Sequence, residues 1–379
     1  MSSKVVVFNS DYDRDFIKEN IKKALSYFDL PDFSDKKFLI KPSLLMAQVP
    51  EKAITTHPIV MEAIVETLKE KNAKEIYIGD TPGSTLSNIT DLYRKTGMEE
   101  VSKKTGAKLI NLYSAGAITI SGNGLVESIP ITKFIKEVDY VINVPKLKTH
   151  NFMLMTCAIK NLFGLVPGTN KAKMHSLAIT PKNFAKILVY ICEEVKPLIN
   201  IVDAIIGMEG EGPSAGNPRR FGKIIVGVDP VAVDTVSSLI LGYRPEEIYT
   251  NVIAYERGLG EMNLENIEII GNTTEGLFNK DVKKGKSLHM LADKVPGFVN
   301  NIASSLYSRF VKLYPAIEDE TCIKCEICAN SCPQKAISLI ANKMIIDYEK
   351  CISCFCCHEL CPQKAIKLEK NFIARRIWR

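Results

Sequence analysis

Short apolar runs alternate with amphipathic segments along roughly the first 270 residues. Short runs of β-branched and aromatic residues predict strands, and apolar residues that recur every three to four positions predict helices. The expected strands are Val5–Phe8, Lys37–Ile40, Glu75–Ile78, Ala107–Leu112, Val138–Val144, Asn200–Ile206 and Lys223–Val228. The expected helices lie near Asp13–Tyr27, Thr56–Asn72, Pro181–Val195 and Pro230–Leu241. This alternation predicts an α/β domain with a mostly parallel sheet covered by helices, in which ligands bind at the carboxyl ends of the strands.

Residues Val295–Leu313 carry one apolar stripe at helical spacing. We expect a helix that connects two domains and docks on the larger one. A membrane-surface helix is the alternative, but its polar face holds few charges. The expected organisation is an α/β domain at 1–294, an amphipathic linker helix at 295–315 and a small α+β domain at 316–379.

The C-terminal region contains eight of the eleven cysteines in two copies of the pattern C-x2-C-x2-C-x3-C-P. Matched positions are separated by 29 residues, and both copies end in P-Q-K-A-I. In this pattern three close cysteines hold one cubane and the fourth binds the other cluster. This is the bacterial ferredoxin pattern, and it predicts that residues 316–379 form a ferredoxin domain with two [4Fe-4S] clusters. The first would be bound by Cys322, Cys325, Cys328 and Cys361, and the second by Cys351, Cys354, Cys357 and Cys332.

Other uses of these cysteines fit less well. Structural zinc does not require four cysteines twice at these spacings, and disulfide frameworks belong to short secreted chains. A radical-generating cluster needs C-x3-C-x2-C, and its third position is Lys335 or Lys364 here. Cys356 is interpreted as a spare thiol near the second cluster, although the spacing also permits an exchange with Cys357. For Cys157 and Cys192 we expect the role of small buried residues.

The composition is that of an ordinary globular protein, with 46% hydrophobic and 24% charged residues. No apolar stretch is long enough to span a membrane, and the N-terminus becomes charged too early for a secretory signal, so we expect a cytoplasmic protein. Cluster thiolates offset part of the formal charge of +6. The basic residues are dispersed, which argues against nucleic-acid binding. The one dense basic group, Arg375, Arg376 and Arg379 around Trp378, is expected to dock on the protein itself or on an acidic partner.

The densest polar segment begins after the strand predicted at Val138–Val144. Basic residues and glycines follow one another there, which suits a small anionic substrate such as a carboxylate or phosphate. The alternative is that these lysines are solvated at the surface and bind no ligand. The candidate catalytic residues are Lys146, Lys148, His150, Lys160 and His175.

A second polar segment, Asp203–Arg220, follows another predicted strand. Its prolines break the context of a dinucleotide-binding loop. Asp203, Glu209 and Glu211 either face the lysines, hold a metal, or are solvated acids of a glycine-rich turn. Asp229 is a natural N-cap before a proline, whereas Asp234 has no such explanation.

Five motifs together resemble a known family: K-P-S-L-L at Lys41–Leu45, P-K-L-K-T-H at Pro145–His150, Lys160-Asn161, G-x-G-P at Gly210–Pro213 and D-P-V-A-V-D at Asp229–Asp234. With the cysteine-rich tail, they resemble the iron-sulfur proteins labelled domain of unknown function 362. The resemblance implies an anaerobe-associated redox protein and supplies no substrate.

Two functions remain open at this point. In the first, electrons pass through the clusters to an anionic substrate held by the basic residues, so the protein is a reductase. In the second, it is a non-catalytic adaptor that docks on a partner redox enzyme. The basic cluster favours the first, and the lack of a flavin or nicotinamide motif favours the second. A cluster-sensing regulator is less consistent with duplicated ferredoxin loops.

Overall fold

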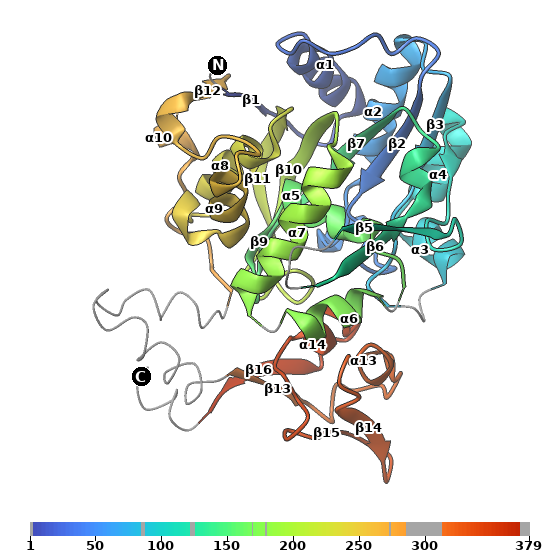
Figure 1. Cartoon of the computed structure of the whole chain (residues 1–379), viewed down its shortest axis with the longest axis vertical. Coiled ribbons are helices and arrows are strands. Elements are labelled where there is room, and N and C mark those ends of the chain that lie inside the picture. The colour runs from blue at the N-terminus through green and yellow to red at the C-terminus, as the bar shows by residue number, and fades with distance from the viewer. Residues whose placement is uncertain are drawn as a thin grey trace.

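A computed structural model of the 379-residue chain describes residues 3–84, 88–121, 126–168, 170–178, 180–272, 274–285 and 313–371. In this part of the chain, ten strands form one large sheet in the order β12-β1-β11-β10-β7-β2-β3-β4, with β8 beside β10 and β9 beside β8 (Figure 1). These strands are β1 (Ser3–Asn9), β2 (Lys37–Pro42), β3 (Glu75–Ile78), β4 (Lys108–Leu109), β7 (Tyr140–Val144), β8 (Lys146–His150), β9 (Leu154–Thr156), β10 (Ile199–Glu209), β11 (Asn217–Gly227) and β12 (Ile267–Ile270). Strand β11 is antiparallel to both neighbours and β9 is antiparallel to β8, whereas the other pairs are parallel. The expected mostly parallel sheet is confirmed.

Helices cover both faces of this sheet (Figure 1). They are α1 (Arg14–Leu25), α2 (Pro58–Glu70), α3 (Ile89–Lys95), α4 (Met98–Thr105), α5 (Ala158–Asn161), α6 (Asn170–Leu177), α7 (Pro181–Val195), α8 (Pro230–Ile240), α9 (Tyr249–Glu256) and α10 (Thr274–Leu277). Strand residues alternate between the two faces. In β2, Phe38 and Ile40 pack in the core with α1 and α2, whereas Leu39 packs in the core that contains α7. A short hairpin of β5 (Ala117–Ser121) and β6 (Ser128–Thr132) lies apart from the large sheet.

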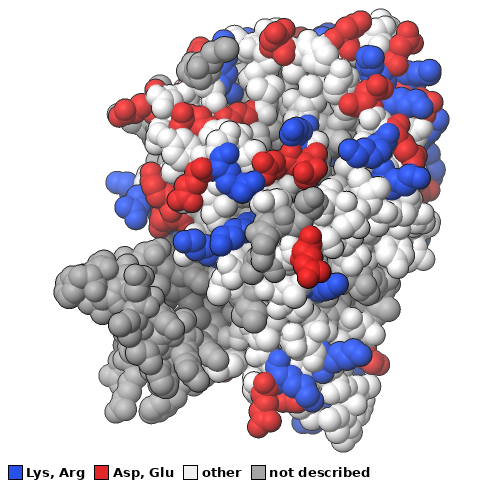
Figure 2. Space-filling view, viewed as in Figure 1, with Lys and Arg blue, Asp and Glu red and all other residues white. Residues whose placement is uncertain are grey.

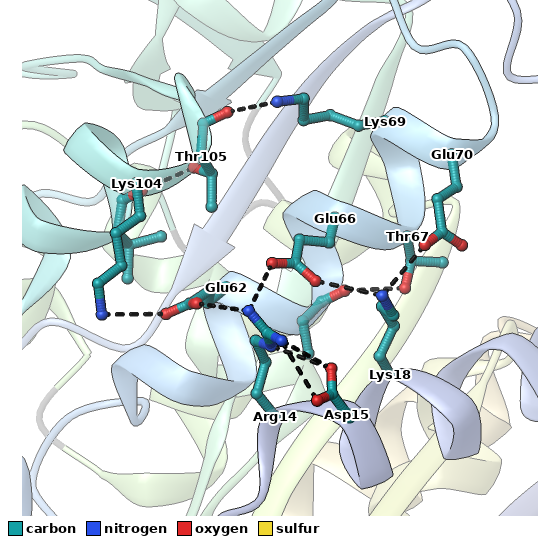
Figure 3. Close-up of polar contacts among 12 residues, drawn as sticks. Arg14, Asp15, Lys18, Glu62, Glu66, Thr67, Lys69, Glu70, Lys104 and Thr105 are labelled. Atoms are coloured by element: carbon teal, nitrogen blue, oxygen red, sulfur yellow. Dashed lines mark hydrogen bonds and ion pairs between the residues drawn. The ribbon is translucent and has the colours of Figure 1, made fainter.

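Ion pairs join α1, α2 and α4 at the surface (Figure 3). Arg14 lies 3.6 Å from Glu62 and 3.3 Å from Glu66. Lys18 also pairs with Glu66, and Lys104 pairs with Glu62. Exposed pairs of this kind each contribute about 0–1 kcal/mol. The apolar faces of these helices, rather than the ion pairs, therefore provide most of the stabilisation of this layer.

The C-terminal region forms a small α+β unit, as expected. It contains β13 (Leu313–Ile317) paired with β16 (Ile366–Lys370), β14 (Ile337–Ile340) paired with β15 (Lys343–Ile346), and two short helices, α13 (Ile327–Asn330) and α14 (Cys356–Leu360). Left-handed backbone conformations recur in both cysteine loops at matched positions, which are Lys324 and Ser353, Glu326 and Phe355, and Lys335 and Lys364. Non-glycine residues seldom adopt this conformation. The sequence repeat is therefore also a repeat of backbone geometry.

Most predicted elements are present, with two differences. Only Lys108–Leu109 of the strand predicted at Ala107–Leu112 pairs with a neighbour. Residues Lys146–His150, where the sequence pattern predicts no strand, form β8. The expected linker helix at Val295–Leu313 falls outside the described residues except for Leu313, which begins β13, and the basic tail from Arg375 also falls outside them.

The surface gives two further observations. Positive and negative side chains are intermixed on the face shown in Figure 2, without a basic stripe. Within the described ranges, no helix is long and apolar enough to cross a membrane. The cytoplasmic location stays a prediction.

Candidate functional site at the domain junction

A cavity of about 120 Å³ lies where the large domain meets α14 of the C-terminal domain. We call it the junction cavity. Its polar lining comes from the carboxyl ends of β2 and β3, from β8 and β9, from α5 and α6, and from the C-terminal domain. These lining residues include Lys41, Asp80, Lys148, Thr156, Lys160, Asn161, Lys171, His175, Ser331, Cys356 and Glu359. The cavity therefore occupies the edge of the sheet at which α/β proteins usually bind ligands.

Lys41 and Asp80 form a closed ion pair at one side of the cavity. Their charged atoms are 3.0 Å apart, and both side chains are buried. The Lys41 ammonium also donates to the backbone oxygen of Pro42 and to Asn161 Oδ1, at 2.8 and 3.1 Å. Burial lowers the pKa of Lys41, an effect that the Asp80 carboxylate opposes. Since both charges are paired, this ion pair holds the two side chains in place in the cavity lining.

Lys148 and Lys171 are each held by backbone carbonyl groups. Lys148 donates to Ile54 O at 2.7 Å, and Lys171 donates to Thr81 O and Pro82 O at 2.6 and 3.0 Å. Burial lowers the pKa of both ammonium groups to about 7. Neighbouring lysines strengthen this shift by repulsion. Both groups can therefore exchange protons near neutral pH.

Lys160 differs from the other lysines of the cavity. It projects from α5 and lines the cavity. Its ammonium group forms no hydrogen bond or ion pair with a described residue. Burial lowers its pKa, while the carboxyl group of Glu359 opposes this effect. Burial raises the pKa of Glu359 to about 7 against the influence of Lys160 and Lys148. Opposite charges from the two domains thus face this part of the cavity.

The two histidines of the site are buried. His150 Nδ1 accepts the backbone N–H groups of Phe152 and Met153 at 3.0 and 3.1 Å, so the proton of the neutral ring is on Nε2. This Nε2 lies 3.2 Å from Glu359 Oε1, but neither atom forms a hydrogen bond with a described residue, and His150 is not among the residues that line the cavity. His175 lines the cavity and stacks on Phe184 with ring centroids 4.2 Å apart. Burial lowers its pKa to about 3, so His175 is neutral at physiological pH.

Lys146 lies apart from the junction cavity. Its ammonium group is 2.8 Å from Asp203 and donates to the hydroxyl oxygen of Tyr12 at 2.7 Å. Asp203 thus faces a lysine, which is one of the alternatives that the sequence left open. Glu209 instead pairs with Arg219 at 2.9 Å. The structure brings together Lys148, Lys160 and His175 in the cavity lining, places His150 beside Glu359, and leaves Lys146 in a separate ion pair.

Asp229 and Asp234 both have structural roles. Asp229 caps α8, as expected, by accepting the N–H groups of Val231 and Ala232. Asp234 accepts the N–H groups of Ala158 and Ile159 at 2.6 and 3.1 Å, at the start of α5. It therefore positions the short helix that carries Lys160.

Hydrogen bonds between the two domains fix α14 and its flanking loops against the large domain. His358 Nδ1 lies 2.6 Å from Ile366 O and donates to it, so its Nε2 accepts from Asn151 Nδ2 at 3.0 Å. Ser214 donates to Glu359 O at 2.6 Å, and Lys364 donates to Gly216 O at 3.0 Å. These contacts hold one wall of the junction cavity in place.

The cysteines gather in two separate hollows of the C-terminal domain. Cys322, Cys325, Cys328 and Cys361 line the first hollow, which we call the first cysteine site. Cys332, Cys351, Cys354 and Cys357 line the second cysteine site, together with Cys356. Backbone N–H groups of Ala336 and Ala365 donate to the sulfur atoms of Cys332 and Cys361, both at 3.2 Å. Four thiolates around one hollow, with N–H···S contacts, fit a [4Fe-4S] cubane. Cys356 also lines the junction cavity, so it separates that cavity from the second cysteine site.

Comparison with known protein families also indicates two iron-sulfur clusters in the C-terminal domain. The family model "4Fe-4S dicluster domain" matches residues 314–362. The protein is thus an iron-sulfur protein of the electron-transfer class, with two [4Fe-4S] clusters. The model "Domain of unknown function (DUF362)" matches residues 38–238 of the large domain. The chain belongs to this family, as the sequence motifs indicated.

Two similar proteins illustrate the range of relatives. The thylakoid-associated protein sll1697 of Synechocystis sp. is 29% identical over 277 residues, which cover 73% of this chain and 84% of the relative. The lactate racemase apoprotein of Thermoanaerobacterium thermosaccharolyticum aligns with a TM-score of 0.44 and 12% identity. That alignment covers 63% of this chain and 57% of the racemase chain, so it spans little more than half of the racemase.

Several cavity residues were absent from the set predicted from the sequence. They are Lys41, Asp80 and Glu359, whereas Lys171 belongs to the predicted polar segment and Cys356 was expected near the second cluster. Lys41 and Asp80 occur at the ends of predicted strands, and this position was the available signal. Nothing in the local sequence indicates Glu359, because it reaches the cavity only through the docking of α14.

Proposed function

We propose that the protein is a reductase-like enzyme in which a small organic anion binds in the junction cavity and receives electrons by way of the second cysteine site. The observation that supports this proposal is the position of Cys356, which lines both the cavity and the second cysteine site. An acceptor in the cavity is thus separated from the cluster ligands by one side chain. A flat surface near the clusters would instead have favoured an adaptor.

We assign the ligands in the crossed pattern that the two hollows suggest. The first set is Cys322, Cys325, Cys328 and Cys361, and the second is Cys332, Cys351, Cys354 and Cys357. When bound, the clusters supply electrons one at a time. Cys325 of the first site is exposed, whereas Cys354 and Cys357 of the second are buried. Electrons from a reduced donor protein would therefore enter at the first site.

The proposed reaction adds two electrons and two protons to a carbon-oxygen or carbon-carbon double bond of the bound anion. The electrons come from the reduced donor protein, and the donor is oxidised. Lys148 and Lys171 supply protons to the substrate and are reprotonated by water, because their pKa values of about 7 suit proton transfer at neutral pH. The remaining cavity groups bind and orient the anion.

Single-turnover measurements test this function. Holoprotein reduced anaerobically with dithionite, and then freed of it, is mixed with small 2-oxo acids and α,β-unsaturated carboxylates. We expect at least one of these acceptors to restore the visible absorbance of the oxidised clusters and to form the reduced organic acid. The Lys148→Met variant should show slower reoxidation, whereas Lys173→Met, on the exposed side of α6, should behave as the wild type.

A protein that is reoxidised by other redox proteins but by none of these small anions would contradict the proposal. That result would support the non-catalytic adaptor instead. Product analysis is needed beside the absorbance, because oxidation by residual oxygen restores the colour without forming a reduced acid.

A further inference from the structure

The four lysines of the junction cavity differ in how their charges are satisfied. Lys41 is paired with Asp80, and Lys148 and Lys171 donate to backbone carbonyl groups. These contacts orient each ammonium group within the wall. Lys160 has no hydrogen-bond or ion-pair partner among the described residues, although it lines the same cavity. The Lys160 side chain is partly exposed, and the nearest opposing charge is the Glu359 carboxyl, so the ammonium group is available in the cavity for a charge-assisted hydrogen bond to a bound anion.

A second polar group is also left without a partner. His175 lines the cavity and is 6% exposed, and its Nδ1 atom forms no hydrogen bond with a described residue. Its ring orientation is set by the surrounding aromatic side chains, because Phe184 stacks on it and Phe163 meets it edge-on at 5.7 Å. A neutral imidazole held in this way provides a hydrogen bond rather than a charge. The cavity thus offers an unpaired cation and an unpaired neutral polar group, beside the Glu359 carboxyl, whose Oε1 also forms no hydrogen bond with a described residue.

The size of the cavity limits the ligand. An enclosed space of about 150 Å³ accommodates benzene, which has six non-hydrogen atoms. The junction cavity, at about 120 Å³, therefore suits a ligand of at most about six such atoms. Acids of two or three carbons and inorganic phosphate meet this limit, whereas a nucleotide would leave most of its atoms outside.

We propose that Lys160 is the anchoring and specificity-determining residue of this site, and that the ligand is a small carboxylate or phosphate whose charged group contacts the Lys160 ammonium while its polar end faces His175. This inference rests on the proposed function for the statement that the ligand is also the electron acceptor. The binding step itself does not depend on it. Lys160 lies on the α5 side of the cavity and Cys356 on the α14 side, so both domains contribute to the binding site.

Calorimetric titration of anaerobic holoprotein tests the binding step with three probes: oxalate, inorganic phosphate and ATP. We expect oxalate or phosphate to bind with 1:1 stoichiometry and ATP to bind more weakly. Lys160→Met should weaken binding of the preferred anion about 10-fold or more, since it removes a charge-assisted hydrogen bond. Lys160→Arg should retain much of the affinity. Lys173→Met, which removes an exposed charge from neighbouring α6, is the matched control.

The comparison of oxalate with phosphate identifies the preferred chemistry of the charged group. Equal affinities of the wild type and Lys160→Met would overturn the inference, and so would the absence of binding by either small anion. A variant that only shifts the cluster potentials, without any change in anion affinity, would show that Lys160 balances the charge of the clusters instead. Iron content and circular dichroism verify that each variant folds with its clusters.

The outcome can be separated from that of the proposed function. If anions bind through Lys160 but none reoxidises the reduced clusters, the binding site stands and the reductase proposal fails. If a small acid reoxidises the clusters equally well in Lys160→Met, the reductase proposal stands and Lys160 is not the anchor.

Discussion

At the scale of single residues, Cys356 is the side chain that connects the two candidate sites. It lines the second cysteine site beside Cys357, and it also lines the junction cavity. The side-chain contact with Cys354, followed by burial, raises the pKa of the Cys356 thiol, and burial raises the pKa of the Cys357 thiol in the same direction. These shifts therefore do not distinguish the two thiols. The assignment of Cys357 as the ligand and of Cys356 as the spare thiol remains a prediction.

Serine variants and iron analysis test this assignment. Holoprotein should contain about eight iron atoms, and Cys357→Ser should lose about half of them. Cys356→Ser should keep both clusters, because the thiol that it replaces is not a ligand. Loss of a cluster in Cys356→Ser, combined with full iron content in Cys357→Ser, would show that the two cysteines exchange roles.

The lysines of the cavity predict a specific pH dependence of anion binding. Burial lowers the pKa values of Lys148 and Lys171 to about 7, so both ammonium groups lose their charge as the pH rises from 6 to 8. The affinity for oxalate should fall over this interval, since oxalate itself keeps its charge there. The charged groups that influence these two lysines are Lys41, Asp80, Lys146, Lys160 and Glu359. Calorimetry at several pH values measures the effect, and an affinity that is constant or rises with pH would contradict it.

At the scale of elements, the short helix α5 depends on a carboxylate of α8. Asp234 is buried and accepts two backbone N–H groups at the start of α5. Asp234→Ala leaves both donors unsatisfied and should lower the free energy of unfolding by about 2 kcal/mol or more. Asp234→Asn retains one acceptor oxygen and should cost less. Urea unfolding of the three proteins provides the measurement.

The same substitution should also affect function, because α5 carries Lys160. We expect Asp234→Asn to weaken oxalate binding even when the protein is folded. An exposed capping residue at another helix is the suitable control. Asp13→Ala removes the cap of α1, which packs in the core with α2, and should reduce stability by about 1 kcal/mol without changing oxalate affinity. Equal oxalate affinity in Asp234→Asn and wild type would show that α5 keeps its position without the carboxylate.

The elements also show how far sequence patterns determine this fold. The helix predicted at Pro181–Val195 has these bounds in the structure, because Thr180 caps it and Pro181 occupies its first turn. By contrast, β4 is shorter than predicted because it pairs with β3 alone, at the edge of the sheet. Strand β8 was not predicted, since its polar residues become buried only through pairing with β10 and closure of the cavity.

The residues of the candidate site, like the elements of the fold, could be predicted from the sequence only in part. Lys148, Lys160 and His175 belong to one polar segment, so their proximity follows from the local sequence. Lys41 and Asp80 come from other strands, and Glu359 comes from the other domain. Their contribution depends on strand order and on domain docking, which hydrophobic periodicity does not encode. The ion pair of Lys146 with Asp203 likewise depends on the pairing of β8 with β10.

At the scale of the whole molecule, the two cysteine sites and the junction cavity lie one after another between the surface and the interior. The first cysteine site contains exposed Cys325, the second is buried beside α14, and the cavity follows on the other side of Cys356. In Figure 1 the C-terminal domain lies beside α6, below the sheet. This order suits the entry of electrons at the outer site and their delivery at the inner one.

If electrons enter at the outer site, a donor protein must dock there. Ile323 lines the first cysteine site and is 60% exposed, so it offers an apolar contact next to the cluster ligands. Ile323→Glu should slow reduction of the holoprotein by a reduced two-cluster bacterial ferredoxin about 10-fold, since loss of a central apolar contact costs on the order of 1–2 kcal/mol. Stopped-flow absorbance measures the rate.

Phe16→Glu makes the same change at an exposed residue of α1, at the opposite end of the molecule, and should leave the rate unchanged (Figure 1). Reduction by dithionite should be similar in all three proteins, and an equal ferredoxin rate in Ile323→Glu and wild type would place electron entry elsewhere.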